Sequence, residues 1–227
     1  MNDKVSAVII GGGALGLAIA DYWLSRGRTD LVLLEKNDGF GLEQSGSNSG
    51  VIHAGFLYPT GSFMARLCVE GVGRLYAFCE KYNVPCKKTG KLMVATNAQQ
   101  EKTLEAYLQR AAENGLRGAE IISGKDAKSI EPCVEAQAAL YVPQSGVFDS
   151  SFFVAALYRS AAARHPTPDM LMKNCKVVGI EAKRNYFTLD VEQFRADTRS
   201  WQIDCDILIN AAGLYSLDLA RMLLQQG

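Results

Sequence analysis

Apolar residues follow two different periods over the first 35 positions of the chain. Residues 5–10 form a short apolar run, partly β-branched, that is typical of a buried parallel strand. Residues 14–26 place apolar side chains at helical spacing, and Gly27 follows as a helix stop. The apolar positions of that helix are Leu15, Ile19, Tyr22 and Trp23. A second apolar run at 31–34 completes the order strand, glycine turn, helix, strand, which predicts a βαβ unit.

The rest of the chain alternates helical and strand-like patterns. We expect helices at 63–82, 97–114 and 150–164, and a last helix that ends near residue 224. We expect strands at 91–96, 139–142, 146–148, 176–182, 186–192 and 201–209. The last three of these strands are expected to form an antiparallel set. Asn97 can cap the helix that follows it, and Gly115 follows the end of that helix.

Composition and charge exclude some function classes. The 227 residues contain 24 Lys and Arg against 24 Asp and Glu, and this balance argues against a general nucleic-acid binder, which needs a basic surface. Six cysteines without a CxxC pair, beside only two histidines, argue against a metal site. We interpret the cysteines as reduced core residues of an intracellular protein. No apolar run reaches the ~20 residues of a membrane span, so we expect no transmembrane segment and a cytoplasmic location, with peripheral membrane contact left open.

The turn after the first strand has the pattern GxGxxG at Gly11, Gly13 and Gly16. The first glycine permits a tight turn, the second lets the backbone approach a pyrophosphate, and the third lets the helix pack on the sheet. The start of the helix, at Ala14 and Leu15, adds unpaired N–H groups and a partial positive charge that favour phosphate. The alternative is a glycine-rich turn without a ligand.

Glu35 lies 19 residues after Gly16, at the end of the second strand. A carboxylate at this position can accept hydrogen bonds from ribose hydroxyls and would repel a 2′-phosphate. Together with the glycine turn, it predicts a dinucleotide site, in which we include the neighbouring Lys36.

The segment 44–55 is rich in small and hydroxylated residues. Ser45, Asn48, Ser49 and Gly50 would let the backbone lie against a flat ring and supply short hydrogen-bonding groups; the alternative is an ordinary surface loop. His53 lies between apolar and small residues. It is either a buried histidine with one structural hydrogen bond or a general base that takes a proton near neutral pH.

Small residues also end the strand at 201–209, where the turn 210–215 follows. A backbone that must pass close to a cofactor favours such residues, although a tight strand-to-helix turn has the same composition. Arg66 and Lys91 are candidates for binding a carboxylate, although charges of this kind more often form a solvated surface.

Residues 44–71 resemble the L-2-hydroxyglutarate dehydrogenase/oxidase family, whose members are FAD enzymes of the D-amino-acid-oxidase-like superfamily. The segments that carry the resemblance are QSGSNSGVIHAG at 44–55, Tyr58-Pro59, ARLCVEG at 65–71, GKLMVA at 90–95, and NAAGLY at 210–215. The resemblance runs from about residue 5 to residue 224. The segment around His53 is fairly specific to this family, whereas the glycine turn is not.

The resemblance implies an α/β fold: a Rossmann-like FAD-binding domain with an inserted α+β substrate domain built on an antiparallel sheet. Residues 1–85 and 150–227 would form the discontinuous FAD-binding domain, and residues 86–149 would be part of the substrate domain. Family members are longer, which implies a fold that is incomplete at the C-terminus.

The resemblance also implies the roles of individual residues. Gly11, Gly13, Ala14, Leu15, Gly16, Glu35 and Lys36 would bind the ADP half of FAD. Ser45, Asn48, Ser49 and Gly50 would line the pyrophosphate and flavin, the backbone of Val178 would meet adenine, and Ala212 and Gly213 would form a second cofactor-contacting turn. Tyr58, Arg66 and Lys91 would face the substrate.

These assignments imply an FAD-dependent oxidoreductase that oxidises an L-2-hydroxy acid to a 2-oxo acid by hydride transfer to the flavin. L-2-hydroxyglutarate is the first candidate substrate. His53 would accept the hydroxyl proton, and oxygen or the quinone pool would take the electrons. The alternatives are a related flavoenzyme for an amino acid or glycerol-3-phosphate, or a non-catalytic FAD-binding fragment that needs a missing C-terminal part.

Overall fold

A computed structural model describes residues 3–194 and 198–224, which form two compact units. Unit 1 comprises Met1–Asn48 and Ser150–Gly227, and unit 2 comprises Ser49–Asp149. The segment 49–85 therefore groups with unit 2, although the sequence analysis placed it with the FAD-binding part. Which of these segments meet the cofactor stays a prediction.

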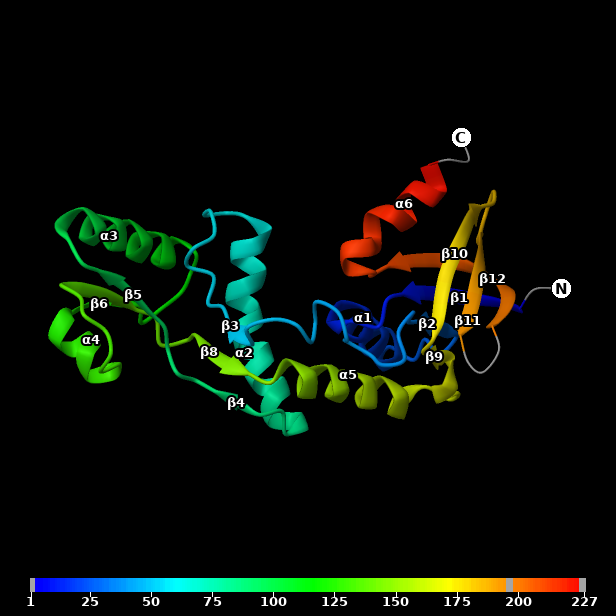
Figure 1. The fold of residues 1–227 in the computed structure, drawn as a ribbon, viewed down its shortest axis with the longest axis horizontal. Coiled ribbons are helices and arrows are strands. Elements are labelled where there is room, and N and C mark those ends of the chain that lie inside the picture. The colour runs from blue at the N-terminus through cyan, green and yellow to red at the C-terminus, as the bar shows by residue number, and fades with distance from the viewer. Residues whose placement is uncertain (1–2, 195–197, 225–227) are drawn as a thin grey trace. The chain divides into compact units, whose positions relative to one another are not determined.

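Unit 1 is built on a six-stranded sheet in the order β10-β11-β12-β1-β2-β9 (Figure 1). Its strands are β1 (Asp3–Ile10), β2 (Leu31–Leu34), β9 (Leu171–Met172), β10 (Cys175–Ala182), β11 (Phe187–Phe194) and β12 (Thr198–Asn210). Strands β12, β1, β2 and β9 run parallel, and β10, β11 and β12 pair antiparallel as expected. Its helices are α1 (Ala14–Ser25), α5 (Ser150–Arg164) and α6 (Ser216–Leu224), with short 3₁₀ turns η1 (Pro168–Met170) and η2 (Gly213–Tyr215).

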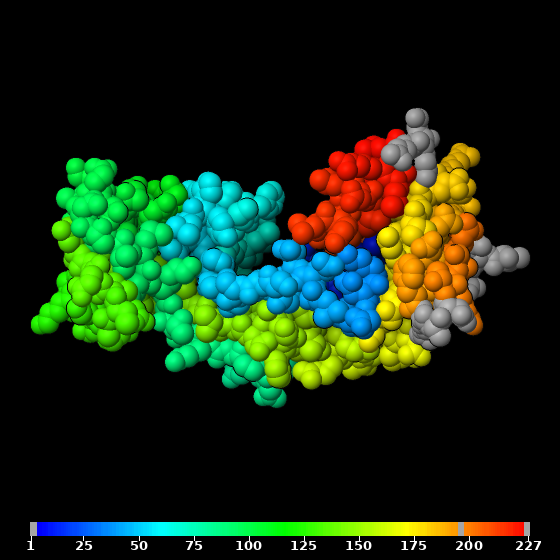
Figure 2. Space-filling model, viewed as in Figure 1, coloured from blue at the N-terminus to red at the C-terminus, as the bar shows by residue number. Residues whose placement is uncertain are grey.

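Residues 7–10 of β1 and all of β2 are buried on both faces, which explains their continuous apolar runs. Val8 and Ile10 of β1 belong to a core that also contains Leu219 of α6 and Val177 of β10. Figure 2 shows α6, in red, beside the yellow strand β10 at the surface of this unit. The alternate residues of β1 lie towards α1, because a side-chain methyl of Ile9 is 3.4 Å from the position of a Cβ on Gly16.

The predicted apolar face of α1 is partly wrong. Leu15 and Tyr22 are 72% and 66% exposed, whereas the buried positions are Gly16, Leu17, Ala20 and Leu24. Gly16 and Ala20 let α1 pack closely on the sheet and on α5, and Leu17 and Leu24 are buried with them. The helical spacing of Leu15, Ile19, Tyr22 and Trp23 therefore does not by itself identify the buried face of this helix.

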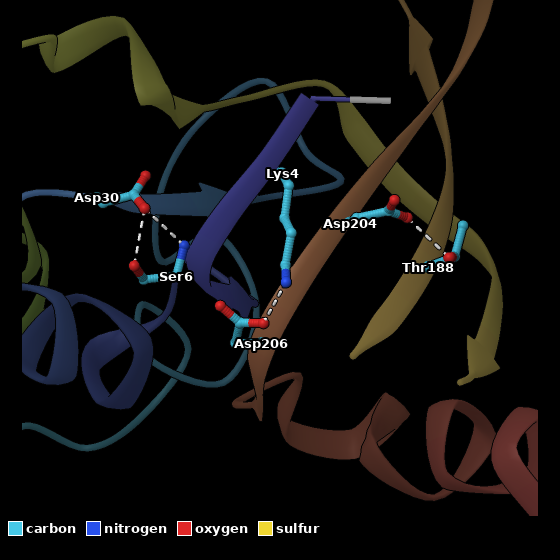
Figure 3. A network of polar contacts seen from close by, with 6 residues as sticks. All are labelled: Lys4, Ser6, Asp30, Thr188, Asp204 and Asp206. Carbon is cyan, nitrogen blue, oxygen red and sulfur yellow. Dashed lines mark hydrogen bonds and ion pairs between the residues drawn. The ribbon is translucent and has the colours of Figure 1, made fainter. Parts of the chain in front are cut away.

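Three polar contacts bridge the strands and a loop in unit 1 (Figure 3). Lys4 of β1 pairs with Asp206 of β12 at 2.6 Å, and Thr188 donates to Asp204 across the antiparallel pair at 2.7 Å. The carboxylate of Asp30 accepts from both the backbone N–H and the hydroxyl of Ser6. The contacts of Lys4 and Ser6 tie β1 to β12 and to the loop before β2, and that of Thr188 ties β11 to β12.

Unit 2 contains two three-stranded antiparallel sheets, β3-β8-β4 and β5-β7-β6. The strands are β3 (Val51–Ile52), β4 (Cys86–Lys87), β5 (Leu92–Ala95), β6 (Glu120–Ser123), β7 (Ala138–Tyr141) and β8 (Gly146–Phe148). The helices are α2 (Phe63–Tyr82), α3 (Ala98–Glu113) and α4 (Gly124–Ile130). The expected antiparallel α+β character of the inserted part is confirmed, although β3, β4, β6 and α4 were not predicted.

Helix caps explain where the helices of unit 2 begin. Ser62, Asn97 and Ser123 each accept a hydrogen bond from the backbone N–H three residues later, at the starts of α2, α3 and α4. The prediction of Asn97 as a cap is therefore confirmed.

Two expectations about single residue types need correction. Cys79, Cys175 and Cys205 are buried, but Cys86 and Cys133 are exposed. A histidine before a proline at a helix end, as in His165-Pro166, is expected at the surface, but His165 is only 6% exposed. Its Nε2 lies 2.9 Å from the carbonyl of Leu31, and its Nδ1 accepts from the N–H of Thr167.

Candidate functional site

The glycine turn and the turn after β12 lie side by side in unit 1. Ile10 and Asn210 are register partners at the ends of two parallel strands, and the N–H of Ala211 donates to the carbonyl of Ile10 at 2.9 Å. Gly11 has a φ of 108°, and a Cβ on it would lie 2.5 Å from the carbonyl oxygen of Ala211. Glycine is thus needed where the two turns touch, at the carboxyl edge of the parallel strands, where α/β sheets bind ligands.

Gly16 allows the closest approach in this turn. A Cβ on Gly16 would lie 1.9 Å from the carbonyl oxygen of Gly11, a distance that no side chain tolerates. A Cβ on Gly13 would lie 2.9 Å from the hydroxyl oxygen of Ser45. The three glycines therefore keep α1 against the turn and keep its first residue within reach of the loop 36–48.

The N-terminus of α1 has donors that fit a pyrophosphate. The N–H of Ala14 donates to Ser45 Oγ at 2.9 Å, and the first intrahelical bond begins at Leu17. Within the described part of the chain, the N–H groups of Leu15 and Gly16 have no hydrogen-bond acceptor. Unpaired N–H groups at a helix start, in a positive helix-dipole field, bind phosphate oxygens well.

Glu35 is 7% exposed and lies beside the glycine turn. Its two carboxylate oxygens accept from the N–H groups of Gly12 at 2.7 Å and Asn37 at 2.9 Å. Each carboxylate oxygen can accept a second hydrogen bond, so the side chain is held in place and can still receive ribose hydroxyls. These residues fit the ADP half of FAD.

Lys36 pairs with two neighbours in unit 1. Its ammonium lies 2.8 Å from Glu43 and 3.4 Å from the centre of the Tyr215 ring. Burial lowers the pKa of Lys36, but its hydrogen bonds to Glu43 and Tyr215 outweigh burial, and the pKa is raised. Lys36 therefore ties the loop after β2 to η2, instead of presenting a free charge.

The other cofactor candidates of unit 1 lie in the turn after β12, in the loop between β2 and β3, and on β10. Ala212 and Gly213 form the turn that touches Gly11, and the amide of Asn48 donates to the carbonyls of Gln44 and Ser45. Val178 lies on β10 beside a break in the pairing register with β11, and its side chain is 37% exposed. Val178 is therefore accessible, on a strand that does not adjoin β1.

In unit 2 the structure brings His53 and Lys91 together with Cys68. The thiol of Cys68 donates to the carbonyl of His53 at 3.0 Å. Burial and the positive charge of Lys91 both lower the pKa of the His53 imidazole. Burial raises the pKa of the Cys68 thiol, and Lys91 opposes that shift. The result is an exposed histidine whose neutral, proton-accepting form is favoured.

The remaining candidates of unit 2 do not all join this group. Arg66 lies on α2, is 62% exposed, and makes a long ion pair of 4.0 Å with Glu70 on the same helix. Tyr58 is half-buried in the loop after His53. Ser49 is exposed, whereas Gly50 is buried with a φ of 60° and accepts a hydrogen bond from the N–H of Phe148.

Asn114 and Arg110, at the end of α3, were not predicted from the sequence. Both donate side-chain hydrogen bonds to the carbonyls of the loop that follows His53. An asparagine at a helix end suggests a cap, but no sequence pattern indicates a partner more than fifty positions away.

The described residues, 3–194 and 198–224, lack two further features. No helix there is both long and apolar enough to cross a membrane. No three His, Cys, Asp or Glu side chains there gather as a metal ion would require.

Comparisons with known proteins agree with this arrangement. The sequence pattern of the family described as FAD dependent oxidoreductase matches residues 6–227. An L-2-hydroxyglutarate dehydrogenase of Indibacter alkaliphilus is 36% identical over 95% of this chain and 52% of its own length. The mitochondrial L-2-hydroxyglutarate dehydrogenases of Arabidopsis thaliana and Homo sapiens are 32% and 31% identical, over 98% and 92% of this chain and 50% and 46% of theirs. The chain thus spans about half the length of the curated relatives it matches.

Solved structures share the fold. The L-α-glycerophosphate oxidase of Mycoplasma pneumoniae, solved with FAD bound, matches with a TM-score of 0.85 and 23% identity over 98% of this chain and 57% of its own. A glycine oxidase from Geobacillus kaustophilus matches with a TM-score of 0.83 and 19% identity over 97% of this chain and 58% of its own. With the glycine turn, the buried Glu35 and the family pattern in agreement, the chain belongs to the family of FAD-dependent oxidoreductases.

Proposed function

We propose that this chain binds FAD and takes part in the oxidation of an L-2-hydroxy acid, with L-2-hydroxyglutarate as the first candidate, to the 2-oxo acid. The observation that carries the proposal is His53, a solvent-accessible imidazole whose pKa is lowered by partial burial and by the charge of Lys91, in a chain related to L-2-hydroxyglutarate dehydrogenases. When bound, FAD supplies the two-electron acceptor that takes the α-hydrogen of the hydroxy acid as hydride.

The cofactor half of the proposal rests on unit 1. The N–H groups of Leu15 and Gly16 bind the pyrophosphate, and Ser45 keeps the start of α1 in place through its bond to Ala14. Glu35 accepts hydrogen bonds from the ribose hydroxyls while two backbone N–H groups hold its carboxylate. The roles of Val178, Ala212 and Gly213 stay predictions of the same proposal.

The chemical role falls to His53. Removing the α-hydrogen of an alcohol with its electron pair leaves a protonated carbonyl, so the hydroxyl proton must pass to a base. A ring nitrogen of neutral His53 accepts this proton. The lowered pKa keeps the imidazole unprotonated at neutral pH, which is the state that a proton acceptor needs.

Lys91 and Arg66 are the proposed partners of the substrate carboxylates. The charge of Lys91 acts on His53, so a carboxylate bound to Lys91 would bring its hydroxyl towards the base. Arg66 makes a long, exposed ion pair with Glu70, which is weak and readily exchanged, and its guanidinium lies 4.9 Å from the centre of the Phe63 ring. A dicarboxylate would use both cations, which favours a 2-hydroxy diacid. Tyr58 stays a third candidate for this role.

A visible spectrum of the purified chain after incubation with FAD tests the cofactor half. We expect flavin absorption near ~450 nm to remain after gel filtration. Loss of this absorption when the FAD-loaded chain is mixed anaerobically with L-2-hydroxyglutarate tests the substrate half of the proposal. The panel includes the D-enantiomer, glycine and glycerol-3-phosphate, because bleaching by one of the latter two would favour the related flavoenzymes. Retained flavin that no substrate bleaches would favour the non-catalytic FAD-binding fragment.

A His53→Gln variant tests the base. We expect flavin binding to persist and the rate of flavin reduction to fall by about 10²- to 10⁴-fold, as for loss of a general base. The control is Ser47→Ala, an exposed position in the preceding segment. Equal reduction rates for His53→Gln and the unmodified protein would exclude the proton-acceptor role.

Three predictions from the sequence stay open within this proposal. They are oxygen or the quinone pool as electron acceptor, a cytoplasmic location with peripheral membrane contact, and the functional division at residues 85 and 149. Stopped-flow reoxidation of the reduced protein by oxygen or by a soluble quinone would distinguish the two acceptors.

A further inference from the structure

The C-terminal end of α3 holds the loop that follows His53. The amide nitrogen of Asn114 donates to the carbonyls of Gly55 and Tyr58, both at 3.1 Å. Arg110, one turn earlier, donates to the carbonyl of Leu57 at 3.3 Å. Three backbone carbonyls of a four-residue stretch are therefore bound by two side chains of one helix.

Packing on α3 supports the same loop. Phe56 is 2% exposed, and its ring meets that of Tyr107 edge-on, with the ring centres 6.4 Å apart. At the far end of the loop, the hydroxyl of Thr60 donates to Glu113 at 2.8 Å. Hydrogen bonds to backbone and burial of an aromatic ring thus act together along the loop.

Helix α2 holds the other side of the same segment. The thiol of Cys68 donates to the carbonyl of His53, and Gly55 lies so close to α2 that a Cβ on it would be 2.9 Å from a methyl group of Val69. His53 is therefore fixed between a contact from α2 and a loop that α3 restrains.

The orientation of the Asn114 amide is determined by this loop. Its Oδ1 is buried and has no hydrogen-bond partner among the described residues. If the amide were flipped, this oxygen would face the carbonyls of Gly55 and Tyr58, and both would lose their donor. The two donations are thus the only side-chain hydrogen bonds of Asn114 in the described structure.

We propose that Asn114 is a positioning residue for His53, which sets the place of the imidazole by binding the carbonyls of Gly55 and Tyr58. Its effect on catalysis rests on the proposed function, whereas its effect on the position of His53 does not. Displacing a reacting group by about 1 Å can lower a rate by ~10²-fold, so a restraint on the loop that follows His53 matters for the reaction.

NMR titration of the imidazole Cε1–H signals measures the position of His53 without any activity assay. The chain has only two histidines, and His165, buried in unit 1, serves as an internal reference. The charged group that acts on His53 among the described residues is Lys91, and the Cys68 thiol contacts its carbonyl. In Asn114→Ala we expect the midpoint of His53 to move upwards, because the loosened imidazole gains water and leaves Lys91, while His165 stays unchanged.

The matched control is Asn97→Ala, which removes the N-cap at the other end of the same helix. This variant weakens α3 without touching the loop. If a weakened helix alone moved the His53 midpoint, both variants would shift it equally. Asn114→Gln keeps an amide donor on a longer side chain and is expected to restore part of the shift.

The kinetic readout is the rate of flavin reduction in the FAD-loaded chain. We expect Asn114→Ala to lower kcat by about 10- to 100-fold with little change in KM. The acidic limb of its pH profile should move to higher pH, together with the NMR midpoint of His53. An unchanged His53 midpoint in Asn114→Ala, or an equal shift in Asn97→Ala, would overturn the proposal.

A second variant covers the case in which Asn114→Ala does not fold. Arg110→Met removes the donation to Leu57 and the contact of the guanidinium with the Tyr107 ring, but keeps both donations of Asn114. We expect a smaller shift in the same direction; no shift would count against the restraint by α3. A shifted midpoint in a chain that oxidises no 2-hydroxy acid would support the positioning role and reject the proposed function. If the chain oxidised L-2-hydroxyglutarate and Asn114→Ala left this activity unchanged, the proposed function would be supported and the positioning role rejected.

Discussion

The hydroxyl of Ser45 accepts a hydrogen bond from the backbone N–H of Ala14 at 2.9 Å and thereby caps α1 from a loop 31 positions away. The residue that precedes the helix, Gly13, has no side chain and provides no cap. The turn thus keeps the space that glycine gives it, and a distant serine supplies the missing acceptor.

Replacing Ser45 with alanine tests this distant cap. Loss of a helix N-cap costs about 1 kcal/mol, and we expect the free energy of unfolding to fall by about that amount in urea denaturation. FAD should also bind less tightly, as measured by flavin fluorescence, because the start of α1 would no longer be fixed. Ser47→Ala, in the same loop and exposed, is the control and should change neither quantity.

Gly16→Ala tests the contact between α1 and the glycine turn. Because the added Cβ would lie 1.9 Å from the carbonyl oxygen of Gly11, the helix must move away from the turn. We expect a lower melting temperature and loss of FAD binding. The contact is with backbone, so no side chain can move aside to relieve it.

Gly73→Ala is the matched comparison, a glycine inside α2 where an added Cβ would meet no atom within 4 Å apart from the backbone of its own helix and its chain neighbours. Alanine is favoured over glycine in helices by about 1 kcal/mol, so this variant should be stabilised. Equal effects of the two substitutions on the melting temperature would show that helix propensity, not the contact with Gly11, decides the outcome at Gly16.

His165→Leu tests a buried polar contact that the sequence did not indicate. The change leaves the buried carbonyl of Leu31 and the partly buried N–H of Thr167 without their imidazole partner. An unsatisfied buried group costs about 1–3 kcal/mol, so we expect a loss in the free energy of unfolding within that range. His165→Gln can restore one of the two bonds and should recover part of the loss. A leucine variant as stable as the unmodified protein would mean that water replaces both contacts.

Local signals account for most of what the sequence predicted. The bounds of α2 and α5 and the cap at Asn97 depend on residues within a few positions of each other. The βαβ unit and the antiparallel set β10-β11-β12 follow from hydrophobic periods of the same local kind. By contrast, β3 and β4 have two residues each, too few to show a period, and exist because both pair with β8.

Contacts between positions far apart in the sequence account for the features that were not predicted. The exposure of Leu15 depends on how closely α1 packs on the sheet, which its helical period does not reveal. For the candidate site, the glycine turn and Glu35 are near one another in sequence and were predicted together. The bonds from Asn114 to Gly55 and Tyr58 span 59 and 56 positions, and only the folded chain shows them.

Lys91→Met tests the electrostatic link to His53. The pKa of His53 is lowered first by burial and then by the positive charge of Lys91, so the protonated imidazole is disfavoured. Removing that charge makes protonation easier, and the pKa of His53 should rise towards its ordinary value of about 6.5. The shift is measured on the imidazole NMR signals, with His165 as the unchanged reference.

The sign of the effect on activity follows from the role of the neutral imidazole. A higher pKa means that His53 is protonated at a higher pH, so the acidic limb of the rate of flavin reduction should move upwards in Lys91→Met. Lys88→Met, which changes the net charge equally at an exposed position, is the control and should leave the limb in place. A limb that moves equally in both variants would point to the overall charge of the protein instead of a direct effect of Lys91. If Lys91 also binds a substrate carboxylate, KM should rise in Lys91→Met alone, and a dicarboxylate should lose more affinity than a monocarboxylate.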